Sequence, residues 1–254
     1  MNRSHLKAWV LTVSIVSALL CAQSSAAQVI PDATLPVGER SQVSGNPNVQ
    51  IDGGARRGGN LFHSFSQFSI PMDGSAYFNN AVDVQNIFSR VTGGSISNID
   101  GLIRANGTAN LFLLNPNGIL FSPNALLNIG GSFVATTATA IGFPNGEVFS
   151  SDGTQPLPSQ LLRINPNVLF FNQLVAQSII NQSTANNGTG LQVPAGQSLL
   201  LLGWRWCFRW HCGATNGCRE RWRFQHHNRI TFNHKWCSTG FSHQRTGKYW
   251  QYKY

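Results

Sequence analysis

Carboxylates are the side chains best suited to catalysis in this sequence, and they are sparse. Glycoside hydrolysis needs a pair of them, and a calcium or magnesium site needs several oxygen ligands around one point. Residues 28–203 hold eight, and no two lie closer than five positions apart: Asp32, Glu39, Asp52, Asp73, Asp83, Asp100, Glu147 and Asp152. We expect Asp83 and Asp100 to serve turns or strand edges. The spacing predicts no catalytic pair, although carboxylates from different turns of a repetitive fold could still meet.

Histidine and serine complete the set of candidate catalytic side chains. His63 is the only histidine between residues 28 and 203, and we expect it at a strand edge rather than in catalysis. Serines are frequent, but none lies in the Gly-x-Ser-x-Gly pattern of a nucleophile elbow, and no phosphate-binding loop is present. We therefore predict no catalytic residue, no metal site and no cofactor.

The last 51 residues, 204–254, hold most of the cysteine and tryptophan. Ten basic residues and one acid lie there, so the whole formal net charge of +9 belongs to this segment. Basic residues interleaved with aromatic ones could bind nucleic acid. The side chains that could instead bind zinc are Cys207, Cys212, Cys218, Cys237, His211, His226, His227, His234 and His243. Their spacing matches no common zinc finger and contains no Cys-x2-Cys pair, so we predict neither metal nor nucleic-acid binding.

The N-terminus has the three parts of a secretory signal. Arg3 and Lys7 precede a short apolar stretch, and Ser25-Ala26-Ala27 offers small residues for cleavage. We predict a signal peptide over residues 1–27 and an exported mature chain. Residues 28–203 contain no cysteine, so this segment must be held together by burial and backbone pairing rather than by disulfides.

Short strand signals with a period near two recur about every ten residues through the segment 28–203, separated by turns rich in Asn and Gly. No convincing amphipathic helix follows the signal. A sandwich, a barrel or a β-solenoid would fit this pattern. Three features favour the solenoid: the strands are very short, the turns tolerate left-handed backbone angles, and small residues at 135–140 suit a tight stack of coils. In such a stack, equivalent asparagines can form a ladder.

Residues 111–121, LFLLNPNGILF, place two apolar stretches around one four-residue turn. Pro116 fixes its own φ and disfavours helix at the preceding residue, while Gly118 can take a positive φ. Asn115 and Asn117 can hydrogen-bond nearby backbone groups. We expect the flanking stretches to be consecutive faces of one coil, both turned into the core. On the residues alone, the sequence suits a change of chain direction here and indicates no further role for the turn.

Several segments together resemble the N-terminal secretion domain of filamentous haemagglutinin-type exoproteins, the cargo of two-partner secretion in Gram-negative bacteria. They are NLFHSFSQFSIP (60–71), NIFSRVTGG (86–94), GLIRANGTANLFLLNPNGILFSPNALLNIGGSFVATTA (101–138) and NNGTGLQVPAGQSLLLLG (186–203). The resemblance implies an all-β domain over residues 28–203. Its fold would be a right-handed parallel β-helix with an N-terminal cap and short extra-helical β elements.

The resemblance also implies a role in export. The partner would be an outer-membrane β-barrel transporter with periplasmic domains. The chain would pass through the periplasm and be secreted or remain at the cell surface. Family members are usually adhesins, so the intact protein would have a cell-surface or carbohydrate receptor.

Asn115, Pro116, Asn117, Gly118 and Ile119 match the family's NPNGI motif, which we take as the candidate transporter-recognition and secretion motif. The family's other signature, Asn-Pro-Asn-Leu, is missing, because the nearest string, NPNV at 46–49, comes before the aromatic segment. That departure puts a recognition role for such a loop in doubt here. The phenylalanines of the aromatic segment are expected in the core: Phe62, Phe65 and Phe68.

The resemblance stops abruptly after residues 199–203, where further Gly-rich coils would be expected. Our hypothesis is a shifted reading frame near Gly203, giving a truncated exoprotein with an irregular, disordered tail at 204–254. Two alternatives to the secretion role remain from the sequence. One is a β-helical carbohydrate-active enzyme of the polysaccharide lyase type, since such enzymes share this fold. The other is a fragment without a present function.

Overall fold

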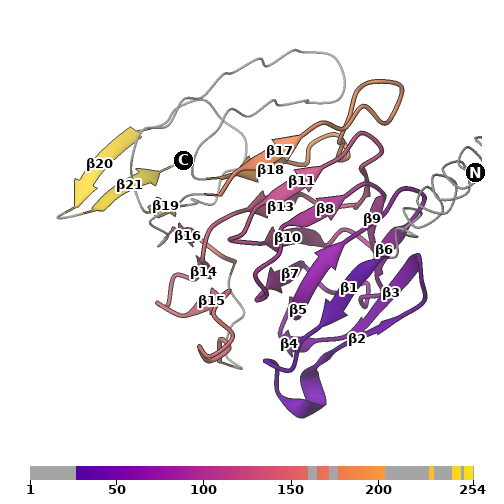
Figure 1. Ribbon diagram of the computed structural model, residues 1–254. Helices are drawn as coiled ribbons and strands as arrows, with labels where there is room; N and C mark the ends of the chain where they lie inside the picture. Colours follow the sequence, from indigo (N-terminus) through magenta and orange to yellow (C-terminus); the bar gives the residue numbers. More distant parts are fainter. Residues whose placement is uncertain are drawn as a thin grey trace, which may run out of the picture.

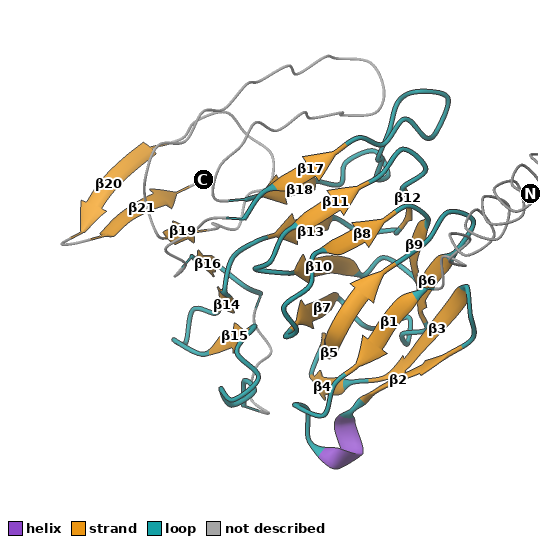
Figure 2. Ribbon diagram, viewed as in Figure 1, coloured by secondary structure: helices purple, strands orange, loops and turns teal. Residues whose placement is uncertain are grey.

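A computed structural model describes residues 27–159, 165–171 and 177–203. It also gives the backbone of three short strands further on: β19 (Arg229–Thr231), β20 (Ser242–Thr246) and β21 (Tyr249–Lys253). Apart from one short 3-10 turn, η1 (Val37–Glu39), the regular structure of these residues is all strand (Figure 2). No helix among them has the length and apolar character of a membrane span. The predicted signal peptide and most of the predicted irregular tail fall outside the described ranges.

The body of the chain winds in coils of two or three short strands each (Figure 1). Coil 1 holds β5 (Asn60–Ser69) and β6 (Ser75–Phe78), and coil 2 holds β7 (Asn86–Val91), β8 (Ser97–Ile99) and β9 (Leu102–Ala105). Coil 3 holds β10 (Asn110–Leu114), β11 (Ile119–Phe121) and β12 (Leu126–Asn128). Coil 4 holds β13 (Phe133–Thr136) and β17 (Ile179–Asn181), and β18 (Leu199–Leu202) begins the next coil.

Equivalent strands of successive coils pair in parallel, which builds three sheets. Sheet A contains β5, β7, β10, β13 and β18, sheet B contains β6, β9 and β12, and sheet C contains β8, β11 and β17. Leu61, Ile87, Leu111 and Phe133 are successive partners, so the coils repeat after 26, 24 and 22 residues. The predicted parallel β-helix is therefore confirmed, and the sandwich alternative is wrong.

Sheet A is buried on both faces. Its later strands β10, β13 and β18 are accordingly mostly apolar, whereas β5 and β7 also bury polar side chains such as His63 and Arg90. One face looks into the lumen of the coils, and the other is covered by an extra-helical excursion of β14 (Ala140–Gly142), β15 (Val148–Ser150) and β16 (Val168–Phe170) (Figure 1). Beneath that cover, Phe62, Phe88 and Phe112 stack with ring centroids 5.0 and 4.8 Å apart. The predicted core positions of Phe62, Phe65 and Phe68 are confirmed, since none is more than 1% exposed.

Asparagines at one position of sheet A form the predicted ladder along the stack. The Asn86 side chain donates to Asn60 Oδ1 and accepts from Asn110 Nδ2, both at 2.9 Å, and Asn110 Oδ1 accepts the Ser132 amide at 2.8 Å. Asn86 also donates to Asn165 Oδ1, beside the excursion, at 2.9 Å. The ladder thus joins four coils through side chains as well as through backbone pairing.

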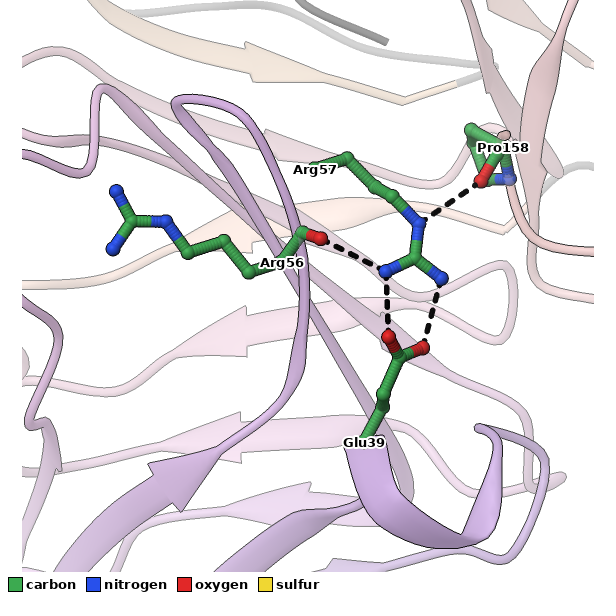
Figure 3. A network of polar contacts seen from close by, with 4 residues as sticks. All are labelled: Glu39, Arg56, Arg57 and Pro158. Atoms are coloured by element: carbon green, nitrogen blue, oxygen red, sulfur yellow. Dashed lines mark hydrogen bonds and ion pairs between the residues drawn. The ribbon is translucent and has the colours of Figure 1, made fainter. Parts of the chain in front are cut away.

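The N-terminal end of the stack is closed by strands that run against the coils. β1 (Gln28–Pro31) pairs antiparallel with β5. β3 (Asn48–Gly53) pairs parallel with β6 and β2 (Ser41–Ser44) pairs antiparallel with β3, so both strands extend sheet B, with β2 at its edge. β4 (Ala55–Arg57) turns back on β5. In Figure 3 the Arg57 guanidinium holds both oxygens of Glu39 at 2.8 Å and also donates to the carbonyl of Pro158, so it ties η1, β4 and the excursion together. This hydrogen-bonded pairing lowers the pKa of Glu39.

A second arginine holds the cap from the other side of β5. Arg90 is completely buried on β7, where its guanidinium donates to Ser64 Oγ, to Thr34 Oγ1 and to the carbonyl of Ser150, and lies 4.7 Å from the Phe149 ring centroid. A buried charge is tolerated only when its donors are used in this way. Arg90 of coil 2 therefore joins the N-terminal cap, coil 1 and the excursion through one buried set of hydrogen bonds.

His63 differs from its predicted place. It lies in the middle of β5 and points into the lumen, only 1% exposed, rather than at a strand edge. The alternation of the strand places it on the same face as Leu61 and Phe65.

Replacing Asn86 with alanine is expected to lower the free energy of unfolding by about 1–3 kcal/mol, because partners on both neighbouring coils lose a buried hydrogen bond. Urea denaturation followed by far-UV circular dichroism measures the change. Asn128→Ala, at an exposed strand end, is the matched control and should change stability by less than about 0.5 kcal/mol. Equal effects of the two substitutions would contradict the structural role of the ladder.

Candidate functional site

The NPNGI motif forms the corner at which coil 3 passes from sheet A into sheet C. β10 ends at Leu114 and β11 begins at Ile119, so four residues make the change of direction. The Gly118 amide donates to the Asn115 carbonyl at 3.2 Å and closes the turn. Gly118 has a φ of 113°, in a region that L side chains rarely adopt. The predicted arrangement of two strands of one coil around this turn is confirmed.

The Asn115 side chain points into the protein and uses both ends of its amide. Its Nδ2 donates to the Ser95 carbonyl at 3.0 Å and to Ser97 Oγ at 2.9 Å, while its Oδ1 accepts the Asn117 backbone amide at 3.0 Å. The residue is 0% exposed. Asn115 therefore binds the corner to the coil beneath it and shapes the turn at the same time.

Asn117 makes the second link to the same coil. Its Nδ2 donates to the Gly93 carbonyl at 2.6 Å and lies 3.2 Å from Asn115 Oδ1. In contrast to its buried neighbours in the motif, Asn117 is only half-buried. Within residues 115–119, Asn117 is thus the one residue that stays partly exposed to solvent while its side chain hydrogen-bonds within the corner.

Backbone hydrogen bonds extend the corner to the following coil. The Asn115 amide donates to the Thr136 carbonyl at 3.0 Å and the Ile119 amide to the Ser178 carbonyl at 3.2 Å. From below, the Ser97 amide donates to the Gly118 carbonyl at 3.1 Å. The five residues singled out in the sequence are therefore brought together at one point, where three coils are fastened to one another.

An apolar strip lies on the outer face of sheet C next to this corner; it consists of Ile96, Leu120 and Ile180. Ile96 is 55% exposed and Ile180 is 47% exposed, while Leu120 is half-buried. Leu120 and Ile180 are direct partners in the register of β11 and β17, and the Ile96 side chain lies against Gly118. Of the three sheets, sheet A has its outer face covered by the excursion, whereas sheet B presents polar side chains such as Gln50 and Arg104.

Sequence reasoning missed the residues of coil 2 that receive the motif: Gly93, Ser95 and Ser97. They lie 18 to 24 positions before the asparagines they contact, and nothing in their immediate sequence marks them. The repeat length of about one coil is the signal that could have pointed to them, since it places Ser97 directly beneath Ile119.

The carboxylates serve caps and turns in the described part of the chain. Asp83 pairs with Arg56 at 2.6 Å, and Asp100 accepts hydrogen bonds from the Asn124 amide and side chain, in line with the predicted turn and edge roles. Asp32 accepts from Thr34, Ser64 and Thr92. Burial alone would raise the pKa of Asp32, but these hydrogen bonds together lower it. Within the described ranges, no three His, Cys, Asp or Glu side chains are grouped to hold a metal ion.

Comparison with known proteins places this geometry in a family. A model of the TPS secretion domain matches residues 27–205. The heme/hemopexin-binding protein of Haemophilus influenzae is 43% identical over 49 residues, which cover 19% of this chain and 5% of that protein. The chain thus spans only a small part of the length of this relative.

A solved structure, the secretion domain of filamentous hemagglutinin, is similar with a TM-score of 0.46 and 18% sequence identity, over 68% of this chain and 55% of the other. The parallel architecture described above rests on the strand registers themselves, and membership rests on the family model, which matches most of the chain. The protein belongs to the TPS secretion domain family and is the N-terminal secretion domain of an exoprotein of two-partner secretion.

Proposed function

We propose that residues 28–203 are the secretion signal of an exported adhesin or haemagglutinin-like exoprotein, read in the periplasm by a dedicated outer-membrane β-barrel transporter. The observation that carries this proposal is the NPNGI corner, where the family's motif fastens three consecutive coils. The role is recognition and not catalysis, and the chain is delivered to the cell surface or the exterior.

The burial of the motif decides how it contributes to recognition. Asn115, Pro116 and Gly118 are buried in the folded domain, so a partner can touch them only after the corner opens. Asn117 and the apolar strip beside it remain accessible. The motif therefore acts mainly by fixing the shape of the corner, and the strip supplies contact area for a periplasmic domain of the transporter.

The receptor of the intact exoprotein is a separate part of the proposal. A cell-surface or carbohydrate receptor is inferred from the family and not from any described residue. The Haemophilus influenzae relative is named for heme and hemopexin binding, but the similarity covers 5% of its length. We assign no such ligand to the described coils.

Export of the mature chain is expected to depend on its transporter. Co-expression in a Gram-negative host with the cognate transporter should place the chain in the culture medium or on the cell surface, and deletion of the transporter's periplasmic domains should retain it in the cell. Immunoblots of medium, surface and periplasmic fractions measure the distribution. Equal export with and without the transporter would refute the proposed partner.

Asn115→Ala is expected to lower the free energy of unfolding by about 1–3 kcal/mol, because it leaves the partners of a buried side chain unsatisfied. Export should fall together with stability. The matched surface change is Leu120→Ser in the apolar strip, which should reduce binding to the transporter's periplasmic domains by more than it reduces stability. Denaturation curves and titration with those domains provide both quantities. If Asn115→Ala abolished binding while stability stayed unchanged, the motif would be a direct contact and the indirect role would be wrong.

A further inference from the structure

His63 is a titratable side chain in an apolar lumen, and the secretion role makes no use of it. Its ring packs against two phenylalanines, with centroids 6.1 Å from Phe65 and 5.4 Å from Phe78. Its neighbours belong to the core that all the coils share. A charge at this position would be separated from water on every side, which is costly in the folded state.

The imidazole is tied to the cap by one hydroxyl. His63 Nδ1 and Ser41 Oγ are 3.1 Å apart, and the same Oγ accepts the Ser64 backbone amide at 3.1 Å. Ser41 begins β2, which is the edge strand of sheet B and pairs only with β3. The Ser41 hydroxyl therefore hydrogen-bonds this edge strand to coil 1, while Val43 of the same strand packs against the core.

Gly54 and Ser89, which lie beside the ring, leave room for the imidazole and carry no charge that would pair with its protonated form. Gly54, with a φ of 90°, leaves room for it, since a Cβ there would lie 2.8 Å from His63 Cε1. On the other side, Ser89 is the register partner of His63, and its buried hydroxyl has no hydrogen-bond partner among the described residues. Neither neighbour carries a charge.

Among the residues that the structure describes, Asp52 is the one charged group that acts on the ring. Asp52 of β3 favours the protonated form, whereas β2, β5, β6 and β7 present Ser41, Phe65, Phe78 and Ser89. Burial outweighs the carboxylate and lowers the pKa of His63 to about 3. Between about pH 3 and pH 6.5, the histidine is thus neutral in the closed cap although it would be charged in water.

We propose that His63 is an acid-sensitive clamp, whose protonation releases edge strand β2 from coil 1 while coils 2 to 4 stay paired. This inference goes beyond the secretion role and does not depend on it. An edge strand can detach by itself more easily than an inner strand, because only one ladder of backbone hydrogen bonds must break. Opening admits water to the ring and so removes the penalty on its charge.

The direction of the pH dependence follows from the two states. The open state binds a proton near the ordinary histidine value of 6.5, whereas the closed state does so only near 3. The clamp is therefore at full strength above about pH 6.5 and weakens as the pH falls towards 3. Between about pH 7 and about pH 5, the open-to-closed ratio should rise about 25-fold. The pKa values of Asp32 and Glu39 in the cap lie below their ordinary values, so both carboxylates remain ionised in this window.

Hydrogen–deuterium exchange of the full mature chain, read by mass spectrometry and corrected for the intrinsic pH dependence of exchange, tests the clamp. The peptide that contains β2, residues 40–45, should lose protection about 25-fold between about pH 7 and about pH 5. Peptides from residues 110–136 serve as the internal control and should keep theirs.

His63→Gln provides a side chain that can still hydrogen-bond but does not titrate, and its cap should open to the same extent at both pH values. His63→Phe serves the same purpose if the glutamine variant does not fold. An equal pH response in wild type and variant, no response in wild type, or loss of protection in all coils together would each overturn the proposal.

Discussion

Parallel pairing of each coil on the next is the constraint on which the structure depends. Every strand of a coil leaves one row of backbone groups unpaired until the following coil arrives. The paired residues are 22 to 26 positions apart from β5 to β13 in sheet A, and 66 apart between β13 and β18, where the excursion intervenes. A single coil therefore has almost no stability of its own, and the stack gains stability only as neighbours are added. The first coil has no predecessor, which explains the cap: β1 and β2 run antiparallel and close the end that parallel strands would leave open.

Buried polar side chains then decide the register. A slip of two residues in sheet A would still place apolar side chains on both of its buried faces, so hydrophobic contacts alone discriminate poorly between registers. The same slip would separate Asn86 from its partners on both sides and leave buried amides unsatisfied, which costs more than the loss of an exposed contact. Asn115 has the same effect at the corner of coil 3. These few hydrogen bonds make one register much better than its neighbours.

Local sequence carried the information about single corners and strands but not about their partners. Short strands, Asn and Gly in the turns, and the Pro116–Gly118 geometry favoured a solenoid and predicted the NPNG corner, whereas the parallel β-helix followed from the family resemblance. The excursion of β14 to β16 has the same local sequence pattern as the coils. Its departure from the stack to cover sheet A could therefore not be predicted from its own residues. His63 was expected at a strand edge, because the local sequence does not show that the cap strand β2 packs over it. The coil 2 residues that receive Asn115 were missed for the same reason: they lie about one repeat earlier.

The position of the motif also limits how a partner can read it. A side chain with all its hydrogen-bonding groups used inside the protein cannot contact a partner without breaking those bonds, and each buried group left unpaired costs about 1–3 kcal/mol. Asn115 would break bonds to Ser95, Ser97 and Asn117 at once, which exceeds what one new polar contact returns. A partner that meets the folded domain therefore gains more from Asn117 and the apolar strip, which need no rearrangement. In the proposed role, the asparagine that is most conspicuous in the sequence would therefore set the shape of the surface, and its neighbours would provide the contact.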